Sequence, residues 1–83
     1  MHNVTFYGLS TCGWCKRTKR FLDANGVEYK LIYVDLLRGA ERERIVAEIK
    51  QCNPQVSFPT VVVDDQTVVI GYRQDRLREV LGL

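Results

Sequence analysis

The chain has 83 residues and a formal net charge of +2, with 46% of its residues hydrophobic and 27% charged. These values are typical of one small folded domain spanning residues 1–83, and they exclude a disordered chain. The charge is too small to indicate a nucleic-acid-binding protein, and no apolar run is long enough to span a membrane. Strand pattern begins within a few residues of the N-terminus and leaves no room for a signal peptide, so we expect a cytoplasmic protein.

Hydrophobic periodicity predicts four strands and three helices. Short apolar segments predict strands over residues 4–7, 29–34, 60–63 and 67–70. Apolar positions three and four residues apart predict helices over residues 14–25, 39–52 and 77–81. The first two strands, joined by a helix, should be parallel, and the last two should form a β-hairpin. We therefore expect an α/β fold in which a four-stranded mixed sheet is covered by three helices.

Two cysteines, Cys12 and Cys15, flank Gly13 and Trp14 between the first strand and the first helix. A side chain at the N-cap of a helix points at free backbone N–H groups, so Cys12 should face those of Trp14 and Cys15. The helix dipole also favours a thiolate over a thiol there. Cys12 is therefore the predicted nucleophile. Cys15, one turn deeper, is the predicted resolving thiol, which attacks a mixed disulfide formed on Cys12.

A cluster of cationic side chains follows the second cysteine, at Lys16, Arg17, Lys19 and Arg20. Such a cluster would favour the thiolate at Cys12 or attract an anionic partner. The alternative is that it forms an ordinary solvated helix face.

Three alternatives to a redox dithiol remain open. A structural disulfide between Cys12 and Cys15 would close a loop of only four residues, and such a disulfide stabilises a fold less than one that closes a longer loop. A zinc site needs four ligands, and only Cys52 and His2 are left as thiol or imidazole candidates. The third alternative is an inert pair with this spacing by chance. An odd cysteine count with one close pair is typical of a reducing compartment, where such pairs are catalytic or metal-binding and not structural. The place of the pair between a strand and a helix argues against chance, so we favour redox chemistry and expect no metal.

The chain resembles the glutaredoxin branch of the thioredoxin fold over essentially its whole length. The dithiol after the first strand, the Phe58-Pro59-Thr60 segment and Gly71 before the last helix all match that pattern. The resemblance implies a thiol–disulfide oxidoreductase that carries electrons through a Cys12–Cys15 disulfide and needs no other cofactor. It also implies a cis peptide bond before Pro59, beside the nucleophile, which leaves the main chain of Phe58 to pair with an extended substrate.

The sequence departs from ordinary glutaredoxins at positions that bind glutathione. Leu9 stands where those proteins carry a lysine, and Gly71-Tyr72-Arg73-Gln74-Asp75 replaces their double-glycine stretch. That segment is similar to the Gly-Phe-Arg-Pro-Asp motif of the glutaredoxin-like redoxins that serve ribonucleotide reductase. The resemblance implies disulfide-containing protein substrates, with ribonucleotide reductase as one candidate. It implies a thioredoxin-reductase-type enzyme or glutathione as the reductant, and we expect the carrier to be a monomer.

Two alternatives stay open within this family. The chain could be a glutathione-dependent glutaredoxin. In addition, Gly13 in place of the usual proline is similar to glutaredoxins that hold a [2Fe–2S] cluster between two subunits with glutathione as co-ligand. The weakened glutathione site argues against the cluster, because the cluster needs glutathione thiolates.

Residues around the dithiol are expected to complete the site. The predicted substrate-binding residues are Trp14, Phe58, Pro59, Tyr72 and Arg73, with Trp14 as a partly exposed apolar platform. The predicted supporting residues are Gly13, Lys16, Thr60, Gly71 and Asp75. Outside the site, Cys52 should be a buried, inert thiol on the apolar face of the second helix, and His2 should be exposed and not catalytic.

Overall fold

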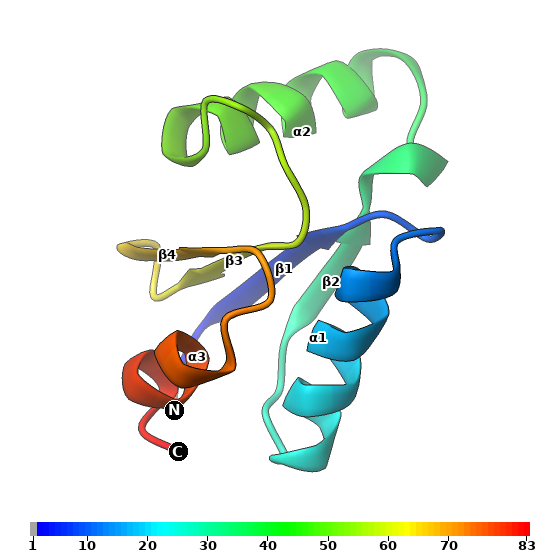
Figure 1. The fold of residues 1–83 in the computed structure, drawn as a ribbon. Helices are drawn as coiled ribbons and strands as arrows, with labels where there is room; N and C mark the ends of the chain where they lie inside the picture. Colours follow the sequence, from blue (N-terminus) through cyan, green and yellow to red (C-terminus); the bar gives the residue numbers. More distant parts are fainter. Residues whose placement is uncertain (1) are drawn as a thin grey trace.

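A four-stranded mixed sheet forms the centre of the computed structural model, which describes residues 2–83 (Figure 1). Its strand order is β2-β1-β3-β4. Strand β1 (Val4–Gly8) pairs in parallel with β2 (Lys30–Tyr33) and antiparallel with β3 (Thr60–Val63). Strand β4 (Thr67–Ile70) pairs antiparallel with β3. The predicted sheet, its parallel pair and its hairpin are therefore confirmed.

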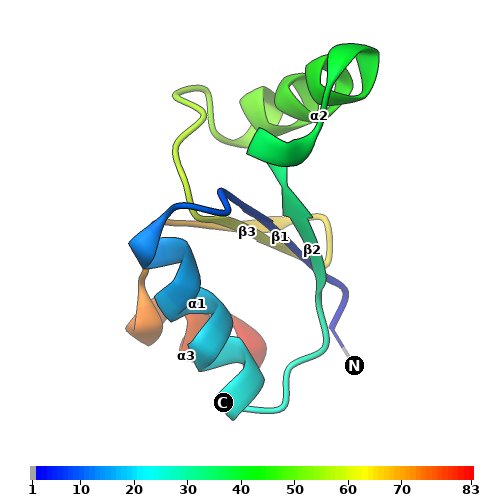
Figure 2. The same ribbon diagram turned by 90° about the vertical axis from the view of Figure 1, so that its right-hand side faces the viewer.

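Three α-helices cover the two faces of this sheet, as predicted. Helices α1 (Gly13–Ala24) and α3 (Gln74–Leu81) lie on one face, and α2 (Gly39–Cys52) lies on the other (Figures 1 and 2). No helix within residues 2–83 has the length and apolar character that a bilayer-spanning segment requires.

The core consists of two clusters, one under each helical layer. The larger cluster lies between the sheet and helices α1 and α3, and its buried members include Phe6, Cys15, Leu22 and Leu77. The smaller cluster lies under α2 and contains Tyr7, Val34, Ile45 and Ile49. Phe58 packs against both clusters, so the segment before β3 is anchored where the two layers meet.

Helix α1 follows from an amphipathic sequence with clear end signals. Its buried positions are Cys15, Thr18, Phe21 and Leu22, at the spacing of one helix face. The Cys12 side chain caps its N-terminus, and it ends at Asn25, before Gly26 with a positive φ of 67°. Trp14, which falls on the same apolar pattern, is 56% exposed because it lies at the open end of the helix.

The element boundaries differ from the sequence prediction by one residue at the ends of β1, α1 and β2, and by three residues at the start of α3. Strand β2 ends at Tyr33, because residues Val34–Leu36 form the short 3₁₀-helix η1. Helix α3 begins at Gln74, earlier than predicted, and Tyr72 and Arg73 precede it. Its first turn is polar and exposed, so apolar periodicity detects only its second half.

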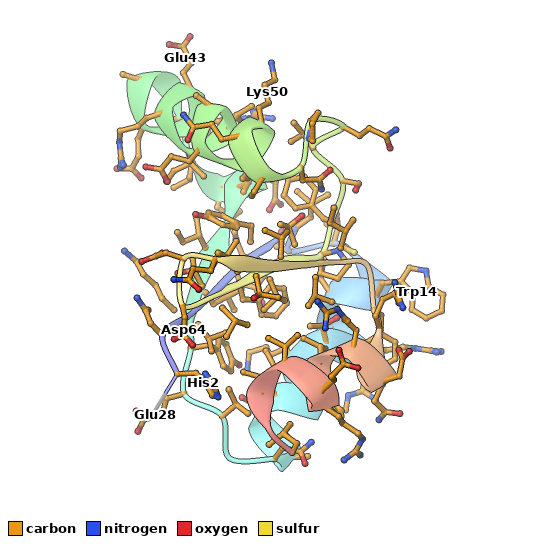
Figure 3. The ribbon with its side chains drawn as sticks, turned by 90° about the vertical axis from the view of Figure 1, so that its left-hand side faces the viewer. His2, Trp14, Glu28, Glu43, Lys50 and Asp64 are labelled. Atoms are coloured by element: carbon orange, nitrogen blue, oxygen red, sulfur yellow. The ribbon has the colours of Figure 1, made fainter. Side chains whose placement is uncertain are left out.

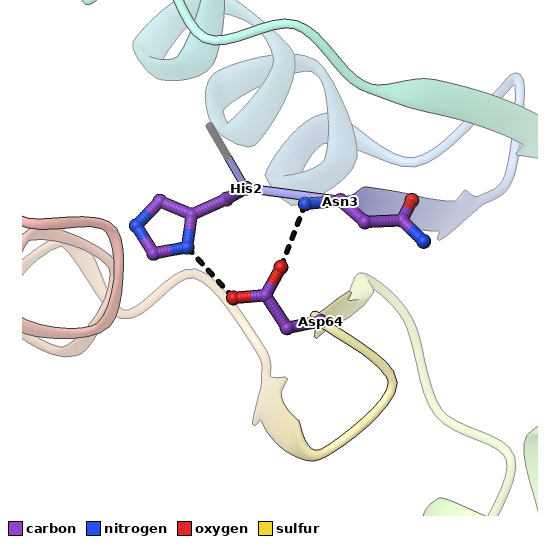
Figure 4. Close-up of polar contacts among 3 residues, drawn as sticks. All are labelled: His2, Asn3 and Asp64. Atoms are coloured by element: carbon purple, nitrogen blue, oxygen red, sulfur yellow. Dashed lines mark hydrogen bonds and ion pairs between the residues drawn. The ribbon is translucent and has the colours of Figure 1, made fainter.

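The N-terminus is fixed to the β3–β4 turn through Asp64, as Figure 4 shows. The Asp64 carboxylate accepts hydrogen bonds from the Asn3 backbone N–H and the His2 ring, each at 2.8 Å. Asp64 and Asp65 both have positive φ, which is the backbone of a tight hairpin turn. His2 is exposed, as expected, and its contact is structural.

Candidate active site

Cys12 occupies the N-cap of α1, as the sequence predicted. Its backbone is extended, and its Sγ accepts a hydrogen bond from the Cys15 backbone N–H at 3.2 Å. The expected second contact, to the N–H of Trp14, is not formed. The first turn of α1 contains no acidic residue, so nothing there offsets the positive end of the helix dipole. A backbone donor and the positive end of the helix dipole therefore both face the Cys12 sulfur.

Cys15 lies beneath Cys12 in an environment of opposite character. Its side chain is 2% exposed and belongs to the larger core cluster. Burial, followed by a hydrogen bond with Cys12, raises the pKa of the Cys15 thiol to about 12. Gly8 lies against this side chain: a Cβ there would be in ordinary contact with the Cys15 Sγ, at 3.5 Å, and in a tight contact with the Phe6 ring, at 3.2 Å. The two thiols therefore differ in their access to solvent, and the Cys15 thiol holds its proton more tightly than a free cysteine does.

The cations that follow the dithiol are mostly turned away from Cys12. The Arg17 guanidinium lies 4.9 Å from the centre of the Trp14 ring, and the Lys19 ammonium lies 2.9 Å from the Asp23 carboxylate. Lys16 is exposed and supplies only its backbone N–H, which bonds to the Cys12 carbonyl. None of these contacts brings a cationic group to the Cys12 sulfur.

The segment before β3 presents a cis peptide bond between Phe58 and Pro59. A polar network fixes it: the buried Asn53 amide lies 3.0 Å from the Thr60 hydroxyl and 3.1 Å from the Ser57 carbonyl. The Thr60 hydroxyl in turn donates to that carbonyl at 2.7 Å. Neither the amide nor the carbonyl of Phe58 takes part in a backbone hydrogen bond within residues 2–83, so both are available to an incoming chain.

A shallow groove lies beside this segment, with a volume of about 230 Å³. It is lined by Trp14, Phe58, Pro59, Gly71 and Tyr72. The rings of Trp14 and Tyr72 are stacked, with their centroids 6.1 Å apart. Figure 3 shows the indole of Trp14 projecting from the body of the molecule. The fold thus brings together four of the five predicted substrate-binding residues.

The remaining predicted residues lie at the edge of the site or outside it. Arg73 does not line this groove, and its guanidinium lies 3.6 Å from the exposed Asp75 carboxylate. Gly13 is exposed at the start of α1. Cys52 was expected to be buried but is half-buried, because it occupies the last position of α2; partial burial still raises its pKa.

Sequence reasoning missed four residues that support the site: Gly8, Ser10, Asp35 and Asn53. The Asp35 carboxylate in η1 accepts a hydrogen bond from the Ser10 backbone N–H at 2.9 Å, and this contact fixes the loop that leads to Cys12. Hydrogen bonds from Ser10 lower the pKa of Asp35. The glycine at the end of a strand before a cysteine pair was a usable signal. The pairing of Ser10 with a residue 25 positions away was not.

The side chains of one chain do not fit a metal centre or a [2Fe–2S] cluster. Within residues 2–83, no three histidine, cysteine or carboxylate side chains come close enough to hold a metal ion. A cluster of this type needs four ligands, and Cys12 is the only thiol at the site with access to solvent. A second copy and two external thiols would have to supply the remainder.

The fold and the dithiol together define a class of protein. A cysteine pair at the N-terminus of the helix after β1, next to a cis-proline at the start of β3, is the arrangement of a thiol redox protein with a thioredoxin-like fold. The glutaredoxin family model matches residues 4–68. The chain therefore belongs to the glutaredoxin family.

Individual relatives agree with this assignment. The gene 56 protein of Mycobacterium phage D29 is 36% identical over 78 residues, which span 94% of this chain and 81% of the phage protein. The crystal structure of Methanosarcina acetivorans methanoredoxin has a TM-score of 0.93 at 40% identity, covering 98% of this chain and 85% of that one. The glutaredoxin from Methanosarcina mazei Go1 has a TM-score of 0.92 at 42% identity, covering 100% and 87%.

Proposed function

We propose that this protein is a dithiol electron carrier that reduces disulfides in other proteins, with Cys12 as the nucleophile and Cys15 as the resolving thiol. The observation that carries the proposal is the asymmetry of the pair. Cys12 is accessible and accepts a hydrogen bond at a helix N-terminus, whereas Cys15 is 2% exposed, with its pKa raised to about 12. An accessible thiolate above a protonated, buried thiol is the arrangement that two-step disulfide exchange requires.

The reaction transfers two electrons in two exchange steps. The Cys12 thiolate attacks one sulfur of a substrate disulfide, forms a mixed disulfide and releases the other substrate sulfur as a thiolate, which takes a proton from water. The Cys15 thiolate then attacks the Cys12 sulfur. This step forms the Cys12–Cys15 disulfide and releases the second substrate thiolate. The substrate disulfide is reduced, and the dithiol of the carrier is oxidised.

The first step prepares Cys15 for the second. Two of the influences that raise the pKa of Cys15 come from Cys12, namely the hydrogen bond and the charge repulsion. Both weaken once Cys12 is held in a mixed disulfide, because its sulfur is then neutral and carries no thiolate charge. Cys15 therefore loses its proton more readily at the stage when it must attack.

The surroundings of the dithiol favour an extended protein segment as substrate. The unpaired main chain of Phe58 can form strand-like hydrogen bonds with a substrate backbone. The stacked rings of Trp14 and Tyr72 offer apolar area for a side chain next to the substrate cysteine. Ribonucleotide reductase, which presents a disulfide that must be reduced in each turnover, is a candidate of this kind.

We propose a thioredoxin-reductase-type enzyme, in place of glutathione, as the electron donor. Leu9 packs against the smaller core cluster at the position where ordinary glutaredoxins carry a lysine. Tyr72 stacks on Trp14 where they have a glycine with an open backbone. Both changes remove contacts that would hold the carboxylates of glutathione, and an enzyme that docks on the groove does not need those contacts.

Trapping experiments with single-cysteine substitutions test this proposal. Cys15→Ser should accumulate mixed disulfides with an oxidised protein substrate on non-reducing gels, because the nucleophile remains and the resolving thiol is absent. Cys12→Ser should trap nothing and reduce nothing. Cys52→Ser is the matched control and should behave like the native protein. Adducts on Cys12→Ser, or none on Cys15→Ser, would contradict the assigned roles.

A further inference from the structure

Helices α1 and α3 lie on the same face of the sheet (Figure 1). A second, larger groove lies between residues of these two helices. Its volume is about 620 Å³. Three arginines line it, Arg17 and Arg20 from α1 and Arg78 from α3. The other lining residues are Phe21, Ala24, Asn25, Tyr72 and Gln74, and none of them is acidic. The groove is therefore lined by apolar, aromatic and amide side chains, and its only charged residues are the three arginines.

The three arginines are not neutralised by the protein itself. None of them belongs to an ion pair within residues 2–83. Neighbouring cations behave differently: Lys19 is paired with Asp23, and Arg76 with Glu79. Arg17 and Arg78 instead lie over aromatic rings, those of Trp14 and Phe21, at 4.9 and 5.2 Å. Stacking on a ring orients a guanidinium while its N–H groups stay free to bind an anion.

The cationic groove is continuous with the active-site groove. Tyr72 lines both of them, and Arg17, at the near end, lies over the ring of Trp14. Along α1 the groove extends from Arg17 to Ala24, a distance of about 10 Å at 1.5 Å per residue. An extended peptide covers this distance with about three residues. A chain that presents its cysteine to Cys12 can therefore continue into the groove.

We propose that this groove binds an acidic segment of the protein substrate, close to the cysteine that Cys12 attacks. The proposal rests on the proposed function and adds a substrate class to it. Two features favour a peptide with several carboxylates over a single small anion. The groove is open along its length, and its three cations are distributed along it on two helices. Carboxylates spaced along an extended chain match this distribution, and arginine binds carboxylates with paired hydrogen bonds.

Exposed charges of this kind act mainly on the rate of association. Complementary surface charges raise the on-rate of a partner, and the effect falls as salt screens them. The groove should therefore select acidic substrates through kcat/KM at low ionic strength, with little effect on the chemical step at the dithiol.

Two matched peptide substrates test the proposal. Each contains one intramolecular disulfide, and they differ only in that the first has four glutamates beside it where the second has four glutamines. At low salt the native protein should reduce the glutamate peptide at least tenfold more efficiently, as measured by kcat/KM. At 0.3 M salt this preference should fall to less than threefold. Equal turnover of the two peptides at low salt would overturn the proposal.

Charge-reversal variants locate the effect. Arg20→Glu combined with Arg78→Glu should reduce the preference to near one. The control, Arg42→Glu combined with Lys50→Glu, changes the net charge equally on α2, across the sheet from the groove; Figure 3 shows Lys50 exposed there. This control variant should keep the native preference for the glutamate peptide over the glutamine peptide. If the control loses as much preference as the groove variant, net charge alone is responsible and the groove is not a binding site.

Two further measurements keep the outcomes distinct. If charge reversal unfolds the protein, as judged by circular dichroism, the Arg20→Gln and Arg78→Gln pair replaces it and should also lose the preference. An oligonucleotide that displaces the glutamate peptide at lower concentration than a disulfide-free copy of that peptide would identify a nucleic-acid site and overturn the proposal. Failure to reduce either peptide would instead contradict the proposed function.

Discussion

The side-chain amide of Asn53 donates a hydrogen bond to the hydroxyl of Thr60 over 3.0 Å, and this bond joins the end of α2 to the first residue of β3. Both side chains are buried, at 3% and 0% exposure, and no buried polar side-chain atom within residues 2–83 lacks a partner. The segment between them carries Phe58 and Pro59. The position of the Phe58–Pro59 segment therefore depends on a polar network that is buried at Asn53 and Thr60 and reaches the surface at Ser57.

Replacement of Asn53 by alanine should destabilise the fold and weaken substrate reduction together. Loss of a buried hydrogen-bond donor costs about 1–3 kcal/mol, and the free Ser57–Pro59 segment would no longer present its main chain in one position. Urea unfolding and kcat/KM on a protein disulfide measure the two effects. Ser57→Ala is the comparison: it removes only one of the three acceptors of the Asn53 amide, on an exposed residue, and should cost less than about 1 kcal/mol. An unchanged Asn53→Ala protein would show that the network is not needed.

The raised pKa of Cys15 predicts a specific loss of stability at alkaline pH. A thiol whose pKa rises from 9.0 to about 12 on folding is held in its neutral form by the native state. Its contribution is complete below pH 9 and is lost as the pH rises toward 12, because the unfolded chain then releases the proton first. The slope should be about 1.4 kcal/mol per pH unit.

The measurement compares the free energy of unfolding of the reduced native protein with that of Cys15→Ala between pH 8 and 11. Subtraction removes the contributions of Tyr7 and Tyr29, whose pKa values are also raised by burial. The difference should be flat below pH 9 and should decline above it. The oxidised protein, where Cys15 has no proton to lose, should lack this additional decline and keep only the part contributed by other groups such as Tyr7 and Tyr29.

The stacked pair of Trp14 and Tyr72 should contribute to substrate binding more than to chemistry. Trp14→Ala removes a large apolar surface and the ring contact, which is worth about 0.5–1.5 kcal/mol, so KM for a protein disulfide should rise about two- to tenfold. The rate of alkylation of Cys12 should not change. Tyr72→Phe keeps the ring and should have little effect on either quantity. A fall in alkylation rate would place Trp14 in the activation of the thiolate.

Glutathione should be a poor electron donor to this protein. Each charge-assisted hydrogen bond to a carboxylate is worth about 1.5–3 kcal/mol, so the absence of one should weaken glutathione tenfold or more. Leu9→Lys combined with Tyr72→Gly restores the missing contacts and should improve turnover with glutathione and its reductase. The same variant should not gain with a thioredoxin-reductase-type system. Efficient turnover of the native protein by glutathione would place it among the ordinary glutaredoxins.

Much of the site could be predicted because its features are local in the sequence. Cys12 was predicted as the nucleophile from its place between a strand and a helix, and Pro59 was predicted from the resemblance to the proline that precedes the third strand of glutaredoxins. Helices and strands were predicted because their apolar residues repeat at regular spacing. The boundaries of α3 and β2 were less accurate, because polar first turns and a 3₁₀ turn have no such periodicity.

Other features depend on contacts between distant residues and could not be predicted. The hydrogen bond between Ser10 and Asp35 joins two loops, and no spacing rule relates them. The orientation of each cationic side chain also could not be predicted. The sequence shows a cluster of cations after Cys15, but the ion pair of Lys19 with Asp23 is visible only in the structure. The same holds for the groove that Arg17 and Arg20 share with Arg78. The groove exists only because α1 and α3 lie side by side.

Cys15 is one of the two cysteines of the redox pair. It is also a member of the hydrophobic core, in the same cluster as Phe6 and Leu22. Oxidation therefore changes a core side chain. The reduction potential then depends on the difference between the free energies of folding of the oxidised and the reduced protein, because the four states form one thermodynamic cycle. A core substitution that stabilises the oxidised packing by 1.4 kcal/mol relative to the reduced packing lowers the potential by about 30 mV. The potential of the dithiol can thus be changed by substitutions in the core, without any change to the residues that line the groove beside it.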